Sequence, residues 1–377
     1  MKGAFIYVDA GKGHYVPAKA LAESFECIGI NAVVEDLFVA YRSPFWRWFC
    51  KNYWRHCLRH PRLEKVLHRL SDIRLNYYNI LKEVSLFGRL DHFKAWCDRE
   101  KPDFIVSTNF LGGIILPKAL KKIGLDIPVF QYVADVFDTP IVGVNDAIYK
   151  FYVPSDLGVR YALRRGQRKE SVARCPFPIQ SKFKEYVFQG KKKARASLNL
   201  KDKFTILISL GGEGIGDNRM LYRLAERKLD VQVVIIGGKH GATNRRFEAF
   251  KRDYPDFDLV CPGFVSNVYE YLDASDIQVG KAGANALMEA MYLQRPCLIS
   301  EVLFMARKVK EFFNEHKVGW CEDNLDKKVD IIERCYRDES LLEEISKNFE
   351  NLPLEFSADR LRDQILEDYG LFKDGKA

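Results

Sequence analysis

Short apolar runs, each followed by a glycine-rich or polar turn and then by a helical pattern, recur along most of the chain and constrain its fold most strongly. This alternation is typical of parallel sheets whose strands are joined by crossover helices. The predicted strands of the N-terminal half are 4–8, 32–34, 104–107, 129–133 and 148–153. Those of the C-terminal half are 205–210, 232–236, 258–260, 277–279 and 296–299. The sequence therefore predicts an α/β protein with two similar halves.

The length of 377 residues predicts two domains, because a single core seldom grows beyond about 250–300 residues. Cys175-Pro176-Phe177-Pro178 cannot continue a helix, and Lys191-Lys192-Lys193 is a charged run typical of solvated segments. We therefore expect a first domain over 1–177, a second over 178–354, and a final helical segment over 355–377.

The composition excludes several classes of protein. Hydrophobic residues make up 47% and charged residues 29%, as in globular proteins, which argues against long disorder. No apolar run approaches the roughly 18 residues that span a bilayer, and the run at 4–8 passes directly to Asp9, too early for a secretion signal. The nine cysteines are scattered without a C-x-x-C pair, so we expect neither disulfides nor a metal site, and a cytoplasmic location.

A glycine loop follows the first predicted strand. It reads Asp9-Ala10-Gly11-Lys12-Gly13-His14, and Pro17 is expected to open the next helix. Gly11 and Gly13 allow the backbone to approach a ligand closely, and the helix N-terminus favours an anion at the carboxyl edge of the sheet. We interpret this loop as one wall of a binding crevice.

Two nucleotide-binding motifs contain a glycine loop after a strand. A dinucleotide fingerprint needs a third glycine where Val16 stands, although Glu35 and Asp36 lie near the expected ribose-binding acid, so a nicotinamide nucleotide remains an alternative. No G-K-[S/T] sequence follows at the required spacing, which excludes a phosphate-binding P-loop. His14 is the nearby group able to accept a proton at neutral pH, and we interpret it as a general base, with a structural role at the helix start as the alternative.

Three more glycine-rich turns follow predicted strands of the second half, at 211–216, 237–239 and 281–285. Their strands are parallel, so the turns meet at one edge of the sheet, where helix N-termini suit a diphosphate. Asn285 is expected to cap the helix after the third turn. Glu289, one turn later, can accept hydrogen bonds from a ribose diol or simply complement the helix dipole. Lys239 and Lys281 are candidate cations for the diphosphate, or solvated lysines.

The segment 41–74 is basic and aromatic. It holds nine Lys or Arg against two acids, and three of the five tryptophans, Trp46, Trp48 and Trp54. Aromatic rings suit the lipid headgroup boundary, and basic residues are attracted to an anionic leaflet. Peripheral membrane binding is the interpretation favoured here. The alternatives are a core of aromatic residues with a solvated basic face, and a nucleic-acid surface, for which no accompanying motif is present.

The ordered motifs resemble those of family 28 glycosyltransferases. They are Asp9-Ala-Gly-Lys-Gly-His14, Gly211-Gly-Glu-Gly-Ile-Gly216, Gly263-Phe-Val-Ser-Asn-Val268 and Lys281-Ala-Gly283 leading to Glu289, followed by Pro296. Over about 300 residues the chain is similar to the lipid branch, the monogalactosyldiacylglycerol synthases and diacylglycerol glucosyltransferases. The resemblance implies the B-type glycosyltransferase fold: two Rossmann-like domains that face each other, an acceptor site in the first, a nucleotide-sugar site in the second, and a final helix that crosses back to the first.

The resemblance also implies a function and roles for individual residues. The reaction would be an inverting, metal-independent transfer of a hexose from a UDP-sugar to a membrane lipid hydroxyl, with diacylglycerol as the expected acceptor. His14 would be the base and Asp135 would support the acceptor side. The donor-binding residues implied or inferred are Gly212, Glu213, Gly214, Gly238, Phe264, Val265, Lys281, Gly283, Ala284, Asn285 and Glu289. The membrane-contacting residues are Trp46, Arg47, Trp48, Lys51, Trp54 and Arg55, which would dock the enzyme on the inner face of the cell membrane.

Several positions depart from the family pattern. Ala286 stands where a hydroxyl is expected beside the diphosphate, and Met305-Ala306 stands where a Gln-Glu pair grips the sugar. Two alternatives to the transferase therefore remain open: a relative that binds nucleotide or lipid without turnover, and a nucleotide-sugar 2-epimerase.

Overall fold

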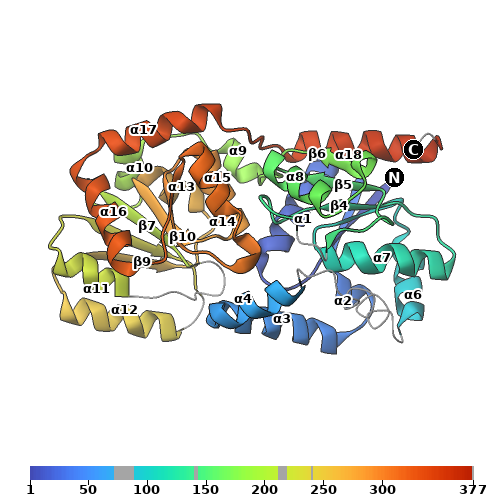
Figure 1. The fold of residues 1–377 in the computed structure, drawn as a ribbon, viewed down its shortest axis with the longest axis horizontal. Helices are drawn as coiled ribbons and strands as arrows, with labels where there is room; N and C mark the ends of the chain where they lie inside the picture. Colours follow the sequence, from blue (N-terminus) through green and yellow to red (C-terminus); the bar gives the residue numbers. More distant parts are fainter. Residues whose placement is uncertain (72–88, 140–142, 211–218, 239–240, 376–377) are drawn as a thin grey trace. The chain divides into compact units, whose positions relative to one another are not determined.

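The computed structural model describes residues 1–71, 89–139, 143–210, 219–238 and 241–375, and the chain divides into two compact units. Unit 1 comprises Met1–Ser181 and Pro353–Ala377, and unit 2 comprises Lys182–Leu352. In each unit the strands lie at the centre with helices around them (Figure 1). The predicted α/β class is confirmed.

Unit 1 contains a six-stranded parallel sheet in the order β2-β1-β3-β4-β5-β6. Its strands are β1 (Lys2–Tyr7), β2 (Asn31–Asp36), β3 (Phe104–Ser107), β4 (Val129–Tyr132), β5 (Lys150–Val153) and β6 (Val172–Arg174). Its helices are α1 (Lys12–Glu26), α2 (Leu37–Ala40), α3 (Pro44–Arg59), α4 (Pro61–Ser71), α6 (Leu90–Glu100), α7 (Phe110–Ile123), α8 (Asp156–Arg164), η2 (Lys169–Ser171) and α18 (Ala358–Lys373).

Unit 2 contains a second six-stranded parallel sheet, in the order β12-β11-β10-β7-β8-β9. Its strands are β7 (Thr205–Ser209), β8 (Gln232–Ile236), β9 (Asp258–Gly263), β10 (Ile277–Lys281), β11 (Cys297–Glu301) and β12 (Gly319–Cys321). Its helices are α10 (Lys191–Ser197), α11 (Arg219–Glu226), α12 (Gly241–Asp253), α13 (Val268–Ala274), α14 (Ala284–Tyr292), η3 (Phe304–Ala306), α15 (Val309–His316), α16 (Leu325–Arg337), α17 (Ser340–Asn348) and η4 (Phe349–Asn351), after the short α9 (Ser181–Glu185) that spans the unit boundary.

The strand order of each sheet determines where a ligand can bind. In unit 1, β2 lies on one side of β1 and β3 lies on the other, so the direction of winding reverses between β1 and β3. In unit 2 the corresponding reversal lies between β7 and β10. Ligands of open α/β sheets bind outside the carboxyl ends of the strands at such a switch point. The glycine loop that ends at His14 follows β1, and the turn at 281–285 follows β10, so both predicted loops lie at switch points.

Two local expectations were wrong, and two edge strands were missed. Pro17 does not open α1 but lies inside it, because Gly11, at φ 93°, turns the chain directly into a helix that begins at Lys12. Asn285 does not cap α14, since Gly283 takes the cap position one residue before the helix. The edge strands β6 and β12 were not predicted, because each has only three residues, all of them half-buried, and carries no apolar run.

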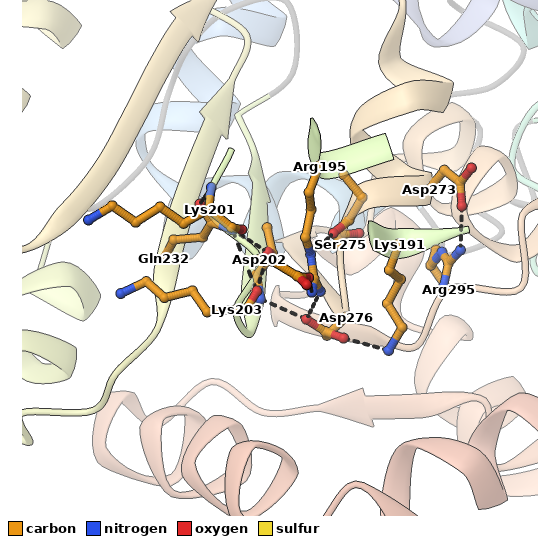
Figure 2. Close-up of polar contacts among 12 residues, drawn as sticks. Lys191, Arg195, Lys201, Asp202, Lys203, Gln232, Asp273, Ser275, Asp276 and Arg295 are labelled. Atoms are coloured by element: carbon orange, nitrogen blue, oxygen red, sulfur yellow. Dashed lines mark hydrogen bonds and ion pairs between the residues drawn. The ribbon is translucent and has the colours of Figure 1, made fainter. Parts of the chain in front are cut away.

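A buried ionic network ties α10 to the amino edge of the sheet of unit 2 (Figure 2). The Oδ2 atom of Asp276 accepts from Arg195 at 2.6 Å and from the backbone N–H of Thr205 at 2.7 Å, and its Oδ1 atom accepts from Lys191 at 2.6 Å. Arg195 also donates to Asp202 at 3.2 Å. Lys191, the first residue of the lysine run that was predicted to be solvated, therefore fixes the first turn of α10 to the sheet.

The C-terminal helix α18 belongs to unit 1, where it packs along α1. Arg362 donates to the carbonyl of Ser24 at 2.9 Å, and Tyr152 of β5 donates to Asp368 at 2.7 Å. A parallel bridge between Phe177 and Phe356 leads into the helix. Unit 1 is thus assembled from two stretches of the chain that are separated by all of unit 2.

Candidate functional site

His14 lies in the first turn of α1, at the switch point of the sheet of unit 1. Its Nδ1 atom is 2.7 Å from the carbonyl oxygen of Thr108, which follows β3 directly. The hydroxyl of Thr108, in turn, donates to the carbonyl of His14 at 2.8 Å. Thr108 is fully buried and therefore fixes the histidine at two points.

These contacts determine the protonation state that suits His14 to act as a base. A carbonyl oxygen only accepts, so Nδ1 carries the proton and donates it to Thr108, which leaves Nε2 of the neutral ring as the acceptor. Burial lowers the pKa of His14, against the smaller opposing effect of the Thr108 hydrogen bond. The ring is therefore neutral at neutral pH and able to take up a proton.

Asp135 lies after β4 and lines a small cavity of about 20 Å³ together with His14, Thr108 and Gln131. Burial raises the pKa of Asp135 to about 7, and the nearby carboxylate of Asp138 contributes to this increase. His68 of α4 has a smaller effect in the opposite direction. Gln131 is 3% exposed, and its Oε1 atom accepts no hydrogen bond within the described part of the chain. Neither Thr108 nor Gln131 belongs to a local sequence motif, and neither was predicted. The structure thus brings the predicted residues His14 and Asp135 to one cavity.

The basic aromatic segment begins as α3, whose two sides have different surroundings. Phe45 and Trp48 are each 62% exposed and Phe49 is 43% exposed, whereas Trp46 packs against the core of unit 1. Trp54 is half-buried, with its indole nitrogen 3.2 Å from where a Cβ on Gly11 would stand.

Two basic residues predicted to face lipid form ion pairs within unit 1. Lys51 Nζ lies 2.9 Å from Asp9 Oδ2, and Arg47 lies 3.6 Å from the same oxygen and 3.9 Å from Asp36. Asp36 caps α2 and accepts from the backbone N–H of Asp9, so it serves as a structural acid where a nicotinamide nucleotide would need a ribose ligand. Arg55 lies half-buried on α3. No helix within the described ranges is long and apolar enough to cross a membrane.

In unit 2, the described donor residues lie at the carboxyl ends of neighbouring strands. Gly238 follows β8 at φ 80°, and Gly237 beside it donates to the carbonyl of Gly263 at the end of β9 at 2.8 Å. Phe264, 57% exposed, and the half-buried Val265 come next. The residues Gly212, Glu213, Gly214 and Lys239 lie outside the described residues.

Helix α14 starts at the end of β10, on the other side of β7, and carries Glu289. Gly283 is its N-cap, so Ala284 and Asn285 are its first two residues. Burial raises the pKa of the Glu289 carboxyl to about 7, against the smaller opposing effect of Lys182. Lys281, the candidate cation, is paired with Glu301 of β11 at 2.7 Å. Glu301 had not been anticipated, because its place beside Lys281 depends on the pairing of β10 with β11.

The described residues show no cluster of metal ligands. Over residues 1–71, 89–139, 143–210, 219–238 and 241–375, no three His, Cys, Asp or Glu side chains come together in a way that could hold a metal ion.

The two sheets with their crossover helices define the class of protein. The chain is similar to the structure of MnaA from S. aureus with UDP, at a TM-score of 0.64 and 13% identity over 99% of this chain and 97% of that chain. It is also similar to MurG of Acinetobacter baumannii, at a TM-score of 0.61 and 13% identity over 97% of this chain and 99% of that chain. These likenesses concern the fold alone, and they confirm the B-type glycosyltransferase fold with its two Rossmann-like domains.

Sequence comparisons point to glycosyltransferases as well. Residues 218–300 match the glycosyltransferase family 28 C-terminal domain. A processive diacylglycerol beta-glucosyltransferase of Bacillus licheniformis is 24% identical over 361 residues, 95% of this chain and 92% of that protein. One of Bacillus cereus is 27% identical over 299 residues, 77% of this chain and 73% of that protein. The predicted resemblance to family 28 glycosyltransferases is confirmed, and the chain is a glycosyltransferase whose residues 218–300 match the C-terminal domain of that family.

Proposed function

We propose that the protein transfers a hexose, with inversion, from a UDP-sugar to the hydroxyl of diacylglycerol at the cytoplasmic face of the cell membrane. The observation that carries this proposal is the neutral His14 at the switch point of unit 1, with Nδ1 committed to Thr108 and Nε2 left to accept a proton. The names of the full-length relatives, which are diacylglycerol glucosyltransferases, support the acceptor and a glucosyl donor.

The reaction is a single displacement. The acceptor oxygen attacks the anomeric carbon, its proton passes to Nε2 of His14, and the bond from that carbon to the diphosphate breaks, so that UDP leaves with the electron pair. Asp135, whose pKa is raised to about 7, lines the same cavity and supports the acceptor side. A positioned base of this kind contributes about 10²- to 10⁴-fold to the rate.

The donor is proposed to bind at the carboxyl edge of the sheet of unit 2. The main chain at Val265 meets the uracil, Glu289 accepts from the ribose hydroxyls, and the N-terminus of α14 with Lys281 meets the diphosphate. Lys281 exchanges its partner Glu301 for the diphosphate in this proposal. Because a helix N-terminus and a cation already meet the charge of the leaving group, we propose that no metal ion is required.

The decisive experiment is a direct transfer assay. The protein is incubated with labelled UDP-glucose, UDP-galactose or UDP-N-acetylglucosamine and diacylglycerol vesicles, with and without a chelator. A labelled glycolipid, formed equally with chelator, is the expected result. UDP binding without any glycolipid would identify a binding relative, and a change in the free nucleotide-sugar alone would identify an epimerase.

We expect nucleotide affinity to rise with pH because of Glu289. Its pKa of about 7 means that the carboxyl is mostly protonated at pH 6 and mostly ionised at pH 8, and the ionised form accepts charge-assisted hydrogen bonds from the ribose. Glu289→Gln should weaken binding at pH 8 by about 1.5–3 kcal/mol and remove the pH dependence. Calorimetry with uridine avoids titration of the phosphates. The matched control is Glu344→Gln on the exposed side of α17, and equal affinities of parent and E289Q at pH 8 would exclude the ribose contact.

We expect the outer face of α3 to bind membranes through apolar area. Phe45→Ser with Trp48→Ser should lower partitioning onto anionic vesicles by about 30- to 900-fold, since each ring loses roughly 1–2 kcal/mol of burial. The loss should persist at high salt, because screening does not act on apolar contacts. The control exchanges two other exposed apolar residues of unit 1, Ile28→Ser with Leu163→Ser. Partitioning equal to that of the control would exclude α3 from the membrane surface.

A further inference from the structure

The inner side of α3 contacts the loop that precedes His14 at two points. At the start of the loop, Asp9 accepts from Lys51 at 2.9 Å and lies 3.6 Å from Arg47. At its end, Trp54 packs against Gly11, where the backbone adopts φ 93°. Residues 47, 51 and 54 are spaced by four and three, so they share one side of the helix. The exposed residues Phe45, Trp48 and Phe49 lie on the other side.

The loop between β1 and α1 is short, so a contact at Asp9 bears directly on His14. Only residues 8–11 separate β1 from α1, and His14 is the third residue of that helix. The backbone N–H of Asp9 donates to the buried Asp36 at 2.7 Å, and this hydrogen bond fixes Asp9 to the edge of the sheet. Its carboxylate is held from the helix side by Lys51. The loop is therefore fixed between the edge of the sheet and α3.

We propose that Lys51 is a positioning residue for His14, which it acts on through Asp9, and that it is not a lipid-facing cation. The proposal rests on the function proposed for His14. The ion pair is partly exposed, so its contribution to stability is small. Its contribution to the reaction is larger, because a displacement of about 1 Å at a reacting group costs up to about 100-fold in rate.

The test compares Lys51→Met with Lys94→Met. Lys94 forms an ion pair of the same 2.9 Å length with Asp98 on α6. Both side chains of that pair are more exposed than those of the pair between Lys51 and Asp9. With detergent-dispersed acceptor, kcat of K51M should fall about tenfold with the donor KM unchanged, whereas K94M should match the parent. Lys51→Arg should restore kcat. Asp9→Asn combined with Lys51→Met should lose no more than Asp9→Asn alone, because the asparagine already removes the ion pair with Lys51.

Hydrogen exchange supplies a readout that does not depend on catalysis. Amides of residues 9–14 should exchange faster in K51M than in the parent and K94M, while vesicle partitioning should stay within about twofold of the parent, since one cation is removed from a paired site. Exchange and kcat equal to those of K94M would overturn the proposal. So would a large loss of partitioning with unchanged exchange, which would make Lys51 a lipid contact. A parent without transferase activity would refute the proposed function, and the exchange result would still decide whether Lys51 orders the loop.

Discussion

Replacing His14 by alanine is expected to lower the transfer rate by about 10²- to 10⁴-fold while UDP binding survives. The imidazole is the proposed base for the acceptor, and its hydrogen-bond partner Thr108 belongs to unit 1, whereas the proposed nucleotide residues belong to unit 2. Single-turnover rates and UDP titration measure the two effects separately. His92→Ala, an exposed histidine on α6, is the control. Turnover of H14A within about tenfold of the parent would remove His14 from the mechanism.

The pH profile of the parent gives an independent view of the same residue. Burial lowers the pKa of His14 below its usual value of 6.5, so the neutral base persists to lower pH than a solvated histidine would. The acidic limb of kcat, measured at saturating donor so that the pH-dependent donor binding attributed to Glu289 does not contribute, should therefore lie below pH 6.5. An acidic limb centred above that value would point to a group whose pKa is raised, such as Asp135.

The second large effect concerns stability. Asp276→Ala should lower the free energy of unfolding of unit 2 by about 3–5 kcal/mol, because it leaves the buried Arg195 and the N–H of Thr205 without their shared acceptor. Asp202→Ala removes an exposed partner of the same arginine and should cost only about 0–1 kcal/mol. Urea denaturation of the full chain measures the free energy of unfolding of both variants. Equal midpoints for the two variants would show that Asp276 does not hold α10 on the sheet.

Buried strands were the easiest elements to predict. The strands Phe104–Ser107 and Gln232–Ile236 have the expected bounds, because each contains an uninterrupted run of apolar residues and is buried along its whole length. β12 was missed because its position is marked chiefly by Gly319, where a side chain would collide with the backbone of Cys297. The need for glycine at this position arises from the contact between two strands, so it produces no local pattern of hydrophobicity in the sequence.

The candidate site was predicted only as far as local motifs reach. His14 stood out because a glycine loop after a strand is a local pattern, and β1 and α1 place it at the switch point. Thr108 did not stand out, because the atom that contacts Nδ1 of His14 is its main-chain carbonyl oxygen, and every residue has such an oxygen. The direction of Arg47 and Lys51 likewise depends on how α3 is rotated against unit 1, which composition does not encode.

The split of unit 1 into two stretches has a consequence for the order in which the protein can fold during synthesis. When residues 1–181 have left the ribosome, the face of α1 that contacts α18 still lacks its cover, and Tyr152 lacks Asp368. Unit 2 is continuous, so it can complete its core first. Unit 1 closes only when α18 emerges, and until then the nascent chain exposes an unfinished domain that chaperones or the membrane surface itself can engage.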